Sequence, residues 1–160
     1  MKLDLLDERK GHPKYNLTQY RLKCVEEIAP ADGYELILVP TSTYQTGVAL
    51  EQLAPPSGQA TFLILSSNWE GVENIDRILP RQRYQLGYPD GGGTIRDGVY
   101  WTNLGAEVHL GLMDSQLSEK FDRVKTLFLK ADMQPDLGES VLISIRRSAI
   151  SNSLTGWWWR

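Results

Sequence analysis

Three consecutive glycines, Gly91 to Gly93, follow an apolar run in LGYPDGGGTIRDGVYW and raise the question of a phosphate-binding loop. Such a loop leads into a helix, because the N–H groups and dipole of a helix N-terminus favour an anion. Here a second turn signal, Asp97-Gly98, is followed by β-branched and aromatic residues typical of a strand. The chain contains no GxGxxG, and no Lys-Ser or Lys-Thr pair follows the glycines. We therefore interpret the glycines as a turn between two strands.

Polar residues follow two apolar runs, at the places where open α/β sheets bind their ligands. Thr41, Ser42 and Gln45 come after YELILVP, and Asn68 comes after ATFLILSS. An amide at position 68 can donate to a carboxamide or keto oxygen, or it can cap the next helix without any ligand. The first three residues can line an adenosine pocket or be ordinary turn residues. Trp69 can stack on a ring or pack into the protein.

The elements that must position these residues alternate between strands and helices. Residues 34–40 and 60–67 are continuous apolar runs, as in strands covered on both faces, and residues 83–89 predict a third strand. Helices are expected between them over residues 44–53 and 71–79, each ending before a proline. This order predicts an α/β fold with a parallel sheet and right-handed crossovers.

The pattern changes after Gly98. Residues 98–102 and 107–111 flank Asn103-Leu104-Gly105, which predicts a hairpin extension. A later helix, capped by Asp114 or Ser115, is expected before an edge strand over residues 132–137. The core face of that helix comprises Leu117, Phe121, Val124 and Phe128. Upstream, residues 20–25 suggest one more strand.

Composition and charge limit the partners. The net charge is −3 and the 17 Lys and Arg form no dense run, so nucleic acid is not expected as a partner. The single cysteine, Cys24, excludes an internal disulfide and a cysteine-based zinc site, and we expect no metal site. The segment MKLDLLDERK is too charged for a signal peptide, and no apolar run approaches the roughly 20 residues of a membrane span. We expect a cytoplasmic protein with no membrane partner.

The order of these motifs resembles the ketopantoate reductase family, NADP-dependent enzymes that reduce a 2-keto acid. YELILVPTSTYQT is similar to the family's strand with its apolar-apolar-x-x-Lys-x-x-Gln segment. FLILSSNWEGVENIDRILP is similar to its buried strand, Asn-Gly-x-Gly and helix. LGYPDGGGTIRDGVYWTNLGAEVHLG is similar to its strand, small-residue turn and hairpin. The resemblance covers about residues 20–137, with a weaker similarity in SAISNSLTG.

The resemblance implies an incomplete Rossmann-like NADP-binding domain with a hairpin extension over residues 1–137, and the start of a helical C-terminal domain over residues 138–160. The family's opening GxGxxG is absent from this chain. The cofactor-binding residues implied by the resemblance are Thr41, Ser42, Gln45, Asn68, Trp69, Gly93 and Thr94. Ser42 replaces the lysine near the adenosine phosphate of the cofactor. Trp69 replaces a glycine and narrows the nicotinamide pocket.

The resemblance places the catalytic lysine of the family near Ser144 and its companion asparagine near Ser148, so both are replaced here. Asn152 matches the second asparagine of that helix and is the catalytic candidate. Arg146 and Arg147 offer positive charge nearby, or form a solvated pair on a helix.

We therefore expect an impaired reductase of a small 2-keto acid with weak or absent NADP binding. The alternative is a non-catalytic α/β module that binds a small anion or a partner protein at the strand-end crevice. The Trp-rich end, GWWWR, covers its own core or meets a partner subunit in a homo-oligomer.

Overall fold

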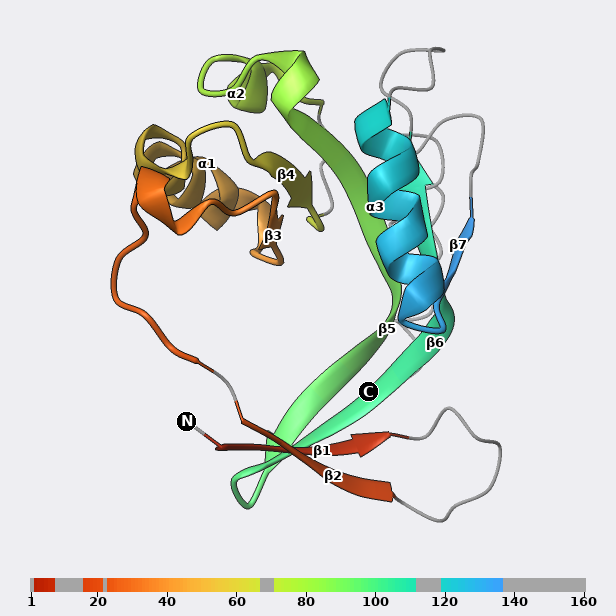
Figure 1. Cartoon of the computed structure of the whole chain (residues 1–160). Helices are drawn as coiled ribbons and strands as arrows, with labels where there is room; N and C mark the ends of the chain where they lie inside the picture. Colours follow the sequence, from red (N-terminus) through yellow and green to blue (C-terminus); the bar gives the residue numbers. More distant parts are fainter. Residues whose placement is uncertain (1, 8–15, 22, 67–70, 112–118, 137–160) are drawn as a thin grey trace, which may run out of the picture.

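The computed structural model describes residues 2–7, 16–21, 23–66, 71–111 and 119–136 (Figure 1). Seven strands form one mixed sheet in the order β2-β1-β6-β5-β4-β3, with β7 beside β6. The strands are β1 (Lys2–Asp7), β2 (Asn16–Arg21), β3 (Leu36–Val39), β4 (Thr61–Ile64), β5 (Tyr84–Arg96), β6 (Val99–Gly111) and β7 (Gln134–Asp136). The α-helices are α1 (Thr43–Leu53), α2 (Glu73–Asp76) and α3 (Glu119–Lys130).

The segment from β3 to β5 is the predicted α/β unit. β3 pairs in parallel with β4, and β4 pairs in parallel with β5, with α1 and α2 as the connections. This confirms the three expected strands and the helix expected over residues 44–53. The helix expected over residues 71–79 is shorter, because Gly71 has a φ of 128° and the chain turns after Asp76 toward Pro80.

Two apolar clusters cover the two faces of the sheet. α1 and α2 contribute to one cluster, which contains Val39, Leu50, Phe62, Ile64, Val72, Ile75, Leu79, Tyr84 and Leu86. α3 covers the other face, where it lies along β5 and β6 (Figure 1). Phe121 and Val124 of α3 pack there with Leu63, Val108 and Leu110, as their helical spacing predicts. Successive residues of β4 thus point to opposite layers.

β5 and β6 form a long hairpin of two 13-residue strands that continues well beyond β4 (Figure 1). The turn expected at Gly91–Gly93 is wrong, because these glycines lie inside β5 and pair with β6. The hairpin expected around Asn103-Leu104-Gly105 is also wrong, because those residues lie inside β6.

The turn of this hairpin is Asp97-Gly98. Both residues have positive φ, 52° and 77°, as a two-residue hairpin turn with right-handed strand twist requires. The glycine run instead follows a shift of register between Pro89 and Gly91. Glycine within a strand commonly marks such an irregularity.

The first two strands extend the sheet at the far end of the hairpin. β1 pairs in parallel with β6 and antiparallel with β2. The strand expected over residues 20–25 overlaps β2 only at Tyr20 and Arg21. β7 pairs in parallel with β6, which confirms the predicted edge strand near residues 132–137. Within the described ranges, no helix is long and apolar enough to cross a membrane.

Replacing Leu63 by aspartate should unfold the protein. Leu63 is fully buried in the middle of β4, where an unpaired carboxylate would lie between the layers. Leu129→Asp is the matched control, because Leu129 lies half exposed on α3. Thermal melts followed by circular dichroism should show a cooperative transition for the control and none for Leu63→Asp. A normal melt for Leu63→Asp would contradict the central position of β4.

Candidate functional site

The carboxyl ends of β3 and β4 lie side by side at one edge of the sheet. Val39 ends β3, and the backbone then turns through Thr41 and Ser42 into α1. The amide of Leu65, just after β4, donates to the carbonyl of Val39 at 3.0 Å. The residue after it, Ser66, therefore lies beside the turn that follows β3. This edge is where ligands of open α/β sheets bind.

A network of hydroxyl groups joins these two strand ends. Thr46 Oγ1 donates to the carbonyl of Ser42 at 3.1 Å, and it lies 3.1 Å from the hydroxyl oxygens of both Thr41 and Ser66. The Thr46 hydroxyl thus donates to the carbonyl of Ser42 and to Ser66 Oγ, and its oxygen can accept from the Thr41 hydroxyl. Thr46 and Ser66 are buried. The network therefore fixes the first turn of α1 to the end of β4.

Ser42 and Gln45 form the exposed part of this edge. Ser42 precedes α1 and makes no side-chain cap, because its hydroxyl donates to Oε1 of Gln45 at 2.6 Å. This bond leaves the Nε2 hydrogens of Gln45 unused by Ser42. The pair therefore offers a hydroxyl oxygen and amide donors to a polar group that approaches from solvent.

The chemistry of the cluster is that of neutral hydrogen bonding. Thr41, Ser42, Gln45, Thr46 and Ser66 contain no group that ionises near neutral pH. They can bind sugar hydroxyls or a carbonyl, and they cannot neutralise a phosphate. In the described part of the chain, no three His, Cys, Asp or Glu side chains are grouped to hold a metal.

The structure brings together three of the predicted cofactor residues, namely Thr41, Ser42 and Gln45. Two others, Gly93 and Thr94, lie on the part of β5 beyond its pairing with β4, opposite Thr102 and Trp101 of β6. The remaining candidates, Asn68, Trp69 and Asn152, lie outside the described residues, as does the Trp-rich end.

Sequence reasoning missed Thr46 and Ser66, the two buried members of the network. Their signal was available, because Ser66 directly follows the apolar run of β4 and Thr46 is one helical turn after Ser42. A threonine at that spacing can bond back to the carbonyl four residues earlier.

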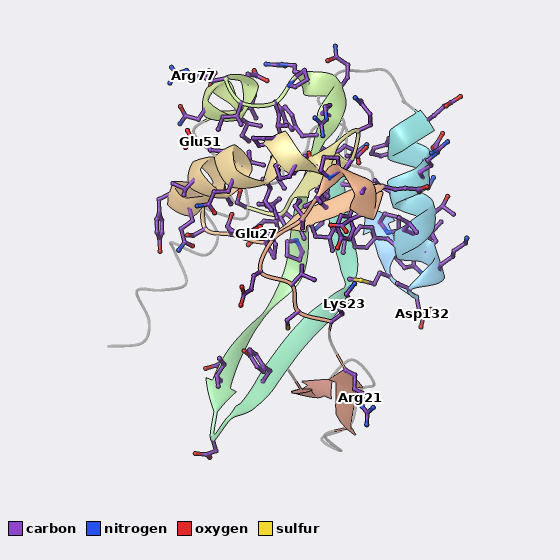
Figure 2. All side chains as sticks on the ribbon, turned by 60° about the vertical axis from the view of Figure 1, so that its left-hand side comes forward. Arg21, Lys23, Glu27, Glu51, Arg77 and Asp132 are labelled. Atoms are coloured by element: carbon purple, nitrogen blue, oxygen red, sulfur yellow. The ribbon has the colours of Figure 1, made fainter. Side chains whose placement is uncertain are left out.

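A shallow groove adjoins the cluster between α1 and α2. Its walls include Tyr44, Thr46, Glu51, Gly71 and Arg77. Figure 2 shows Glu51 and Arg77 on the same side of the molecule, one on α1 and the other just after α2. Tyr44 is 84% exposed at this groove, so a ring bound there would meet an aromatic face.

α2 is held in place by a carboxylate with two partners. Asp76 Oδ2 accepts from Arg81 at 2.7 Å, and its Oδ1 accepts from the Tyr84 hydroxyl at 2.7 Å. The Arg81 hydrogen bond holds the pKa of Asp76 below its usual value against the opposing effect of burial, and the Tyr84 hydrogen bond lowers it further. Since Tyr84 begins β5, these bonds fix the end of α2 to the sheet.

No family model matches this sequence, and no curated protein matches it either. Several solved structures are similar to it in fold. A 2-dehydropantoate 2-reductase from Porphyromonas gingivalis W83 has a TM-score of 0.69 at 18% identity, over 89% of this chain and 49% of that one. D-mandelate dehydrogenase with NADH and anilino(oxo)acetate has a TM-score of 0.67 at 20% identity, over 92% and 47%. The 2-dehydropantoate 2-reductase from Geobacter metallireducens GS-15 has a TM-score of 0.60 at 17% identity, over 90% and 46%.

These structures establish the fold. This chain spans about half the length of each of the three. The partial Rossmann-like α/β fold that the motifs imply is confirmed, and it is the fold found in ketopantoate reductases.

The Asp76 interactions should appear in the pH dependence of stability. The folded pKa of Asp76 is lowered, so its contribution is present above about pH 4, the ordinary aspartate value, and is lost as the pH falls through the folded pKa. Asp76→Asn should therefore lower stability at neutral pH and make the acid limb of the profile shallower. Urea melts between pH 2 and pH 7, in ~0.5-unit steps, measure this. Arg81→Met should flatten the same limb, and an unchanged slope in both variants would contradict the assignment.

Removing the hydroxyl of Thr46 should loosen the strand-end edge. Thr46→Val keeps the side-chain volume and deletes three contacts at a buried site, so we expect a loss of about 1–2 kcal/mol of stability. Thr126→Val on α3 is the control, because it deletes the same type of bond to a carbonyl four residues earlier at an exposed position. Denaturant melts of both variants measure the difference. Equal losses would show that the network contributes no more than one exposed bond.

Proposed function

We propose that this chain is part of a nicotinamide-dependent reductase of a small 2-keto acid, with the cofactor at the carboxyl edge of β3 and β4. The supporting observation is the position of Ser42 and Gln45, which expose a bonded hydroxyl–amide pair where doubly wound sheets bind dinucleotides. The fold is also that of reductases of 2-dehydropantoate and of a mandelate dehydrogenase that holds NADH.

Each candidate residue has a role in this proposal. When bound, a nicotinamide cofactor supplies the hydride for the keto carbon. Ser42 and Gln45 bond the adenosine portion, with Thr41 behind them. Asn68 donates to the carboxamide or keto oxygen, and Trp69 narrows the pocket around it.

The remaining candidates belong to the other side of the site. Gly93 allows the cofactor close to the backbone of β5, beside Thr94. Asn152 binds the keto acid. No lysine stands at the matched position of the C-terminal segment, so this chain lacks the lysine that would polarise the keto oxygen.

Charge argues against a strong preference for NADP. The cofactor NADP carries a phosphate that NAD lacks, and Ser42 stands where the resemblance places a phosphate-pairing lysine. A neutral pair of Ser42 and Gln45 fits ribose hydroxyls better than a phosphate dianion. We therefore propose that NADH binds at least as well as NADPH.

The second candidate is a non-catalytic module that binds a small anion or a partner protein at the same edge. The neutral chemistry of the described cluster favours the partner protein over the anion, because none of the five side chains carries a positive charge or can transfer a proton at neutral pH. Both candidates use the crevice, and they differ in whether a nicotinamide cofactor enters it.

Calorimetric titration of the whole chain with NADPH and NADH tests the function. We expect NADPH to bind no more tightly than high micromolar, because the chain has neither a GxGxxG for the pyrophosphate nor a lysine at position 42. Asn68→Ala should weaken binding by roughly 1–3 kcal/mol and change folding stability little. Gln52→Ala, at an exposed position of α1, is the control and should leave both unchanged.

Three outcomes would each contradict a part of this proposal. Submicromolar NADPH binding would contradict the proposed cofactor chemistry at Ser42. A stability loss of about 1 kcal/mol in Asn68→Ala without weaker binding would identify Asn68 as a helix cap. No binding of either nucleotide would favour the non-catalytic module.

A further inference from the structure

A separate cavity lies at the amino ends of β3 and β4, at the opposite end of these strands from the candidate site. Its volume is about 310 Å³, which is near the lower limit for sites that bind small molecules. Residues from three segments of the chain enclose it, namely 30–36, 57–61 and 123–127. The cavity therefore lies on the α3 face of the sheet, between the helix and the two strands.

Thr61 supplies an unpaired hydroxyl to this cavity. The residue begins β4, is 7% exposed and lines the cavity. Its amide donates to the carbonyl of Glu35 at 2.9 Å, whereas its hydroxyl bonds to no described residue. A buried hydroxyl without a partner is costly. A polar ligand atom in the cavity would therefore be stabilised by it.

Two opposite charges stand at the same cavity without being paired to each other. Glu35 comes just before β3, and Arg123 lies one turn into α3. Both residues are exposed, and within the described part of the chain neither side chain makes a salt bridge or a hydrogen bond. A ligand that carries both a carboxylate and an ammonium group would pair with both.

The wall between these charges is apolar. Val124 is buried and packs with Leu36 in the cluster on the α3 face. Leu127, one turn further along α3, is 48% exposed although its side chain is apolar. An apolar group of a ligand that packs against these three side chains would remove Leu127 from water.

The two loops that wall the cavity are held in place by hydrogen bonds. The carboxylate of Asp32 accepts from the amide of Ala29 at 2.8 Å and closes the turn before β3. Nη2 of Arg83 donates to the Ser57 hydroxyl at 2.8 Å and to the carbonyl of Ala60 at 3.1 Å. A ligand would thus enter a preformed site, so little conformational entropy would be lost on binding.

We propose that this cavity binds a small zwitterion with an apolar side chain, that is, an aliphatic α-amino acid. The guanidinium of Arg123 pairs with the ligand carboxylate, which also accepts from the Thr61 hydroxyl. The Glu35 carboxylate pairs with the ligand ammonium group, and the apolar wall contacts the ligand side chain. The site lies outside the crevice of the proposed function and does not rest on that function.

Calorimetric titration of the whole chain with three probes of similar shape tests the ligand class. L-leucine carries both charges, isocaproate lacks the ammonium group and isoamylamine lacks the carboxylate. We expect L-leucine to bind with a Kd below about 1 mM, and the other two probes to bind about tenfold more weakly. No binding of L-leucine, or equal affinity for all three probes, would overturn the proposal. Nucleotide is absent throughout, so this outcome is separate from that of the cofactor titration.

Charge variants test the two ion pairs one at a time. Arg123→Gln should weaken L-leucine binding about tenfold and should no longer distinguish L-leucine from isoamylamine. Glu35→Gln should likewise no longer distinguish L-leucine from isocaproate. Lys125→Gln is the matched control, because it removes a cation of α3 that does not line the cavity, and it should bind as the wild type does. Circular dichroism verifies that all three variants fold. Equal affinity of Arg123→Gln and Lys125→Gln for L-leucine would overturn the proposal.

Thr61→Val separates binding from folding. Valine keeps the side-chain volume and removes the unpaired hydroxyl, so folding stability should stay the same or rise. Binding of L-leucine should weaken about tenfold, because the ligand carboxylate loses a hydrogen bond. Denaturant melts and the same titration measure the two effects. A loss of stability, or an unchanged affinity for L-leucine, would contradict the role of Thr61 in the site.

Discussion

Burial of β4 on both faces is the constraint on which the rest of the structure depends. All four residues of Thr61–Ile64 are buried. Phe62 and Ile64 need a layer on one side and Leu63 needs a layer on the other, so neither helical layer alone would suffice. β3 and β5 satisfy the backbone of β4 on its two edges. Since parallel strands require crossover connections, the turns that leave β3 and β4 emerge at one edge of the sheet.

That edge becomes a defined surface because polar groups are paired within it. Thr46 receives or donates three hydrogen bonds from a buried position, which makes the turn after β3 and the end of β4 one unit. Gly87 of β5 leaves room for the residue that follows β4. A Cβ at position 87 would lie 2.9 Å from Leu65 Cδ2 and 3.3 Å from the carbonyl oxygen of His109. A larger residue at position 87 would therefore have to displace the Leu65 side chain. Ser42 and Gln45 are presented on a rigid base as a result.

The sequence predicted the elements whose signals are local. Continuous apolar runs located β3 and β4, and helical spacing located α1 and the core face of α3. The prediction from sequence failed where the pairing of strands determines the structure. Gly91 to Gly93 have the composition of a turn, but Asp97-Gly98 supplies the positive φ values that the hairpin needs, and the glycines are then carried inside β5. Three of the six residues of β1 are charged, and its position in the sheet is set by its pairing with β6. No local feature of the sequence predicts that pairing. Among the residues of the candidate site, the exposed ones were predicted from the sequence, and the buried Thr46 was not.

The open edge of β3 and the crevice at its carboxyl end are physically linked. In a doubly wound sheet the dinucleotide crosses the point where the strand order reverses, so the neighbour of the first strand forms one wall of the site. A parallel neighbour would bring a loop and a helix N-terminus to that wall, with N–H groups for the pyrophosphate. Among the described strands β3 has no such neighbour, so this part of the crevice is lined by the hydroxyl and amide groups of Ser42 and Gln45.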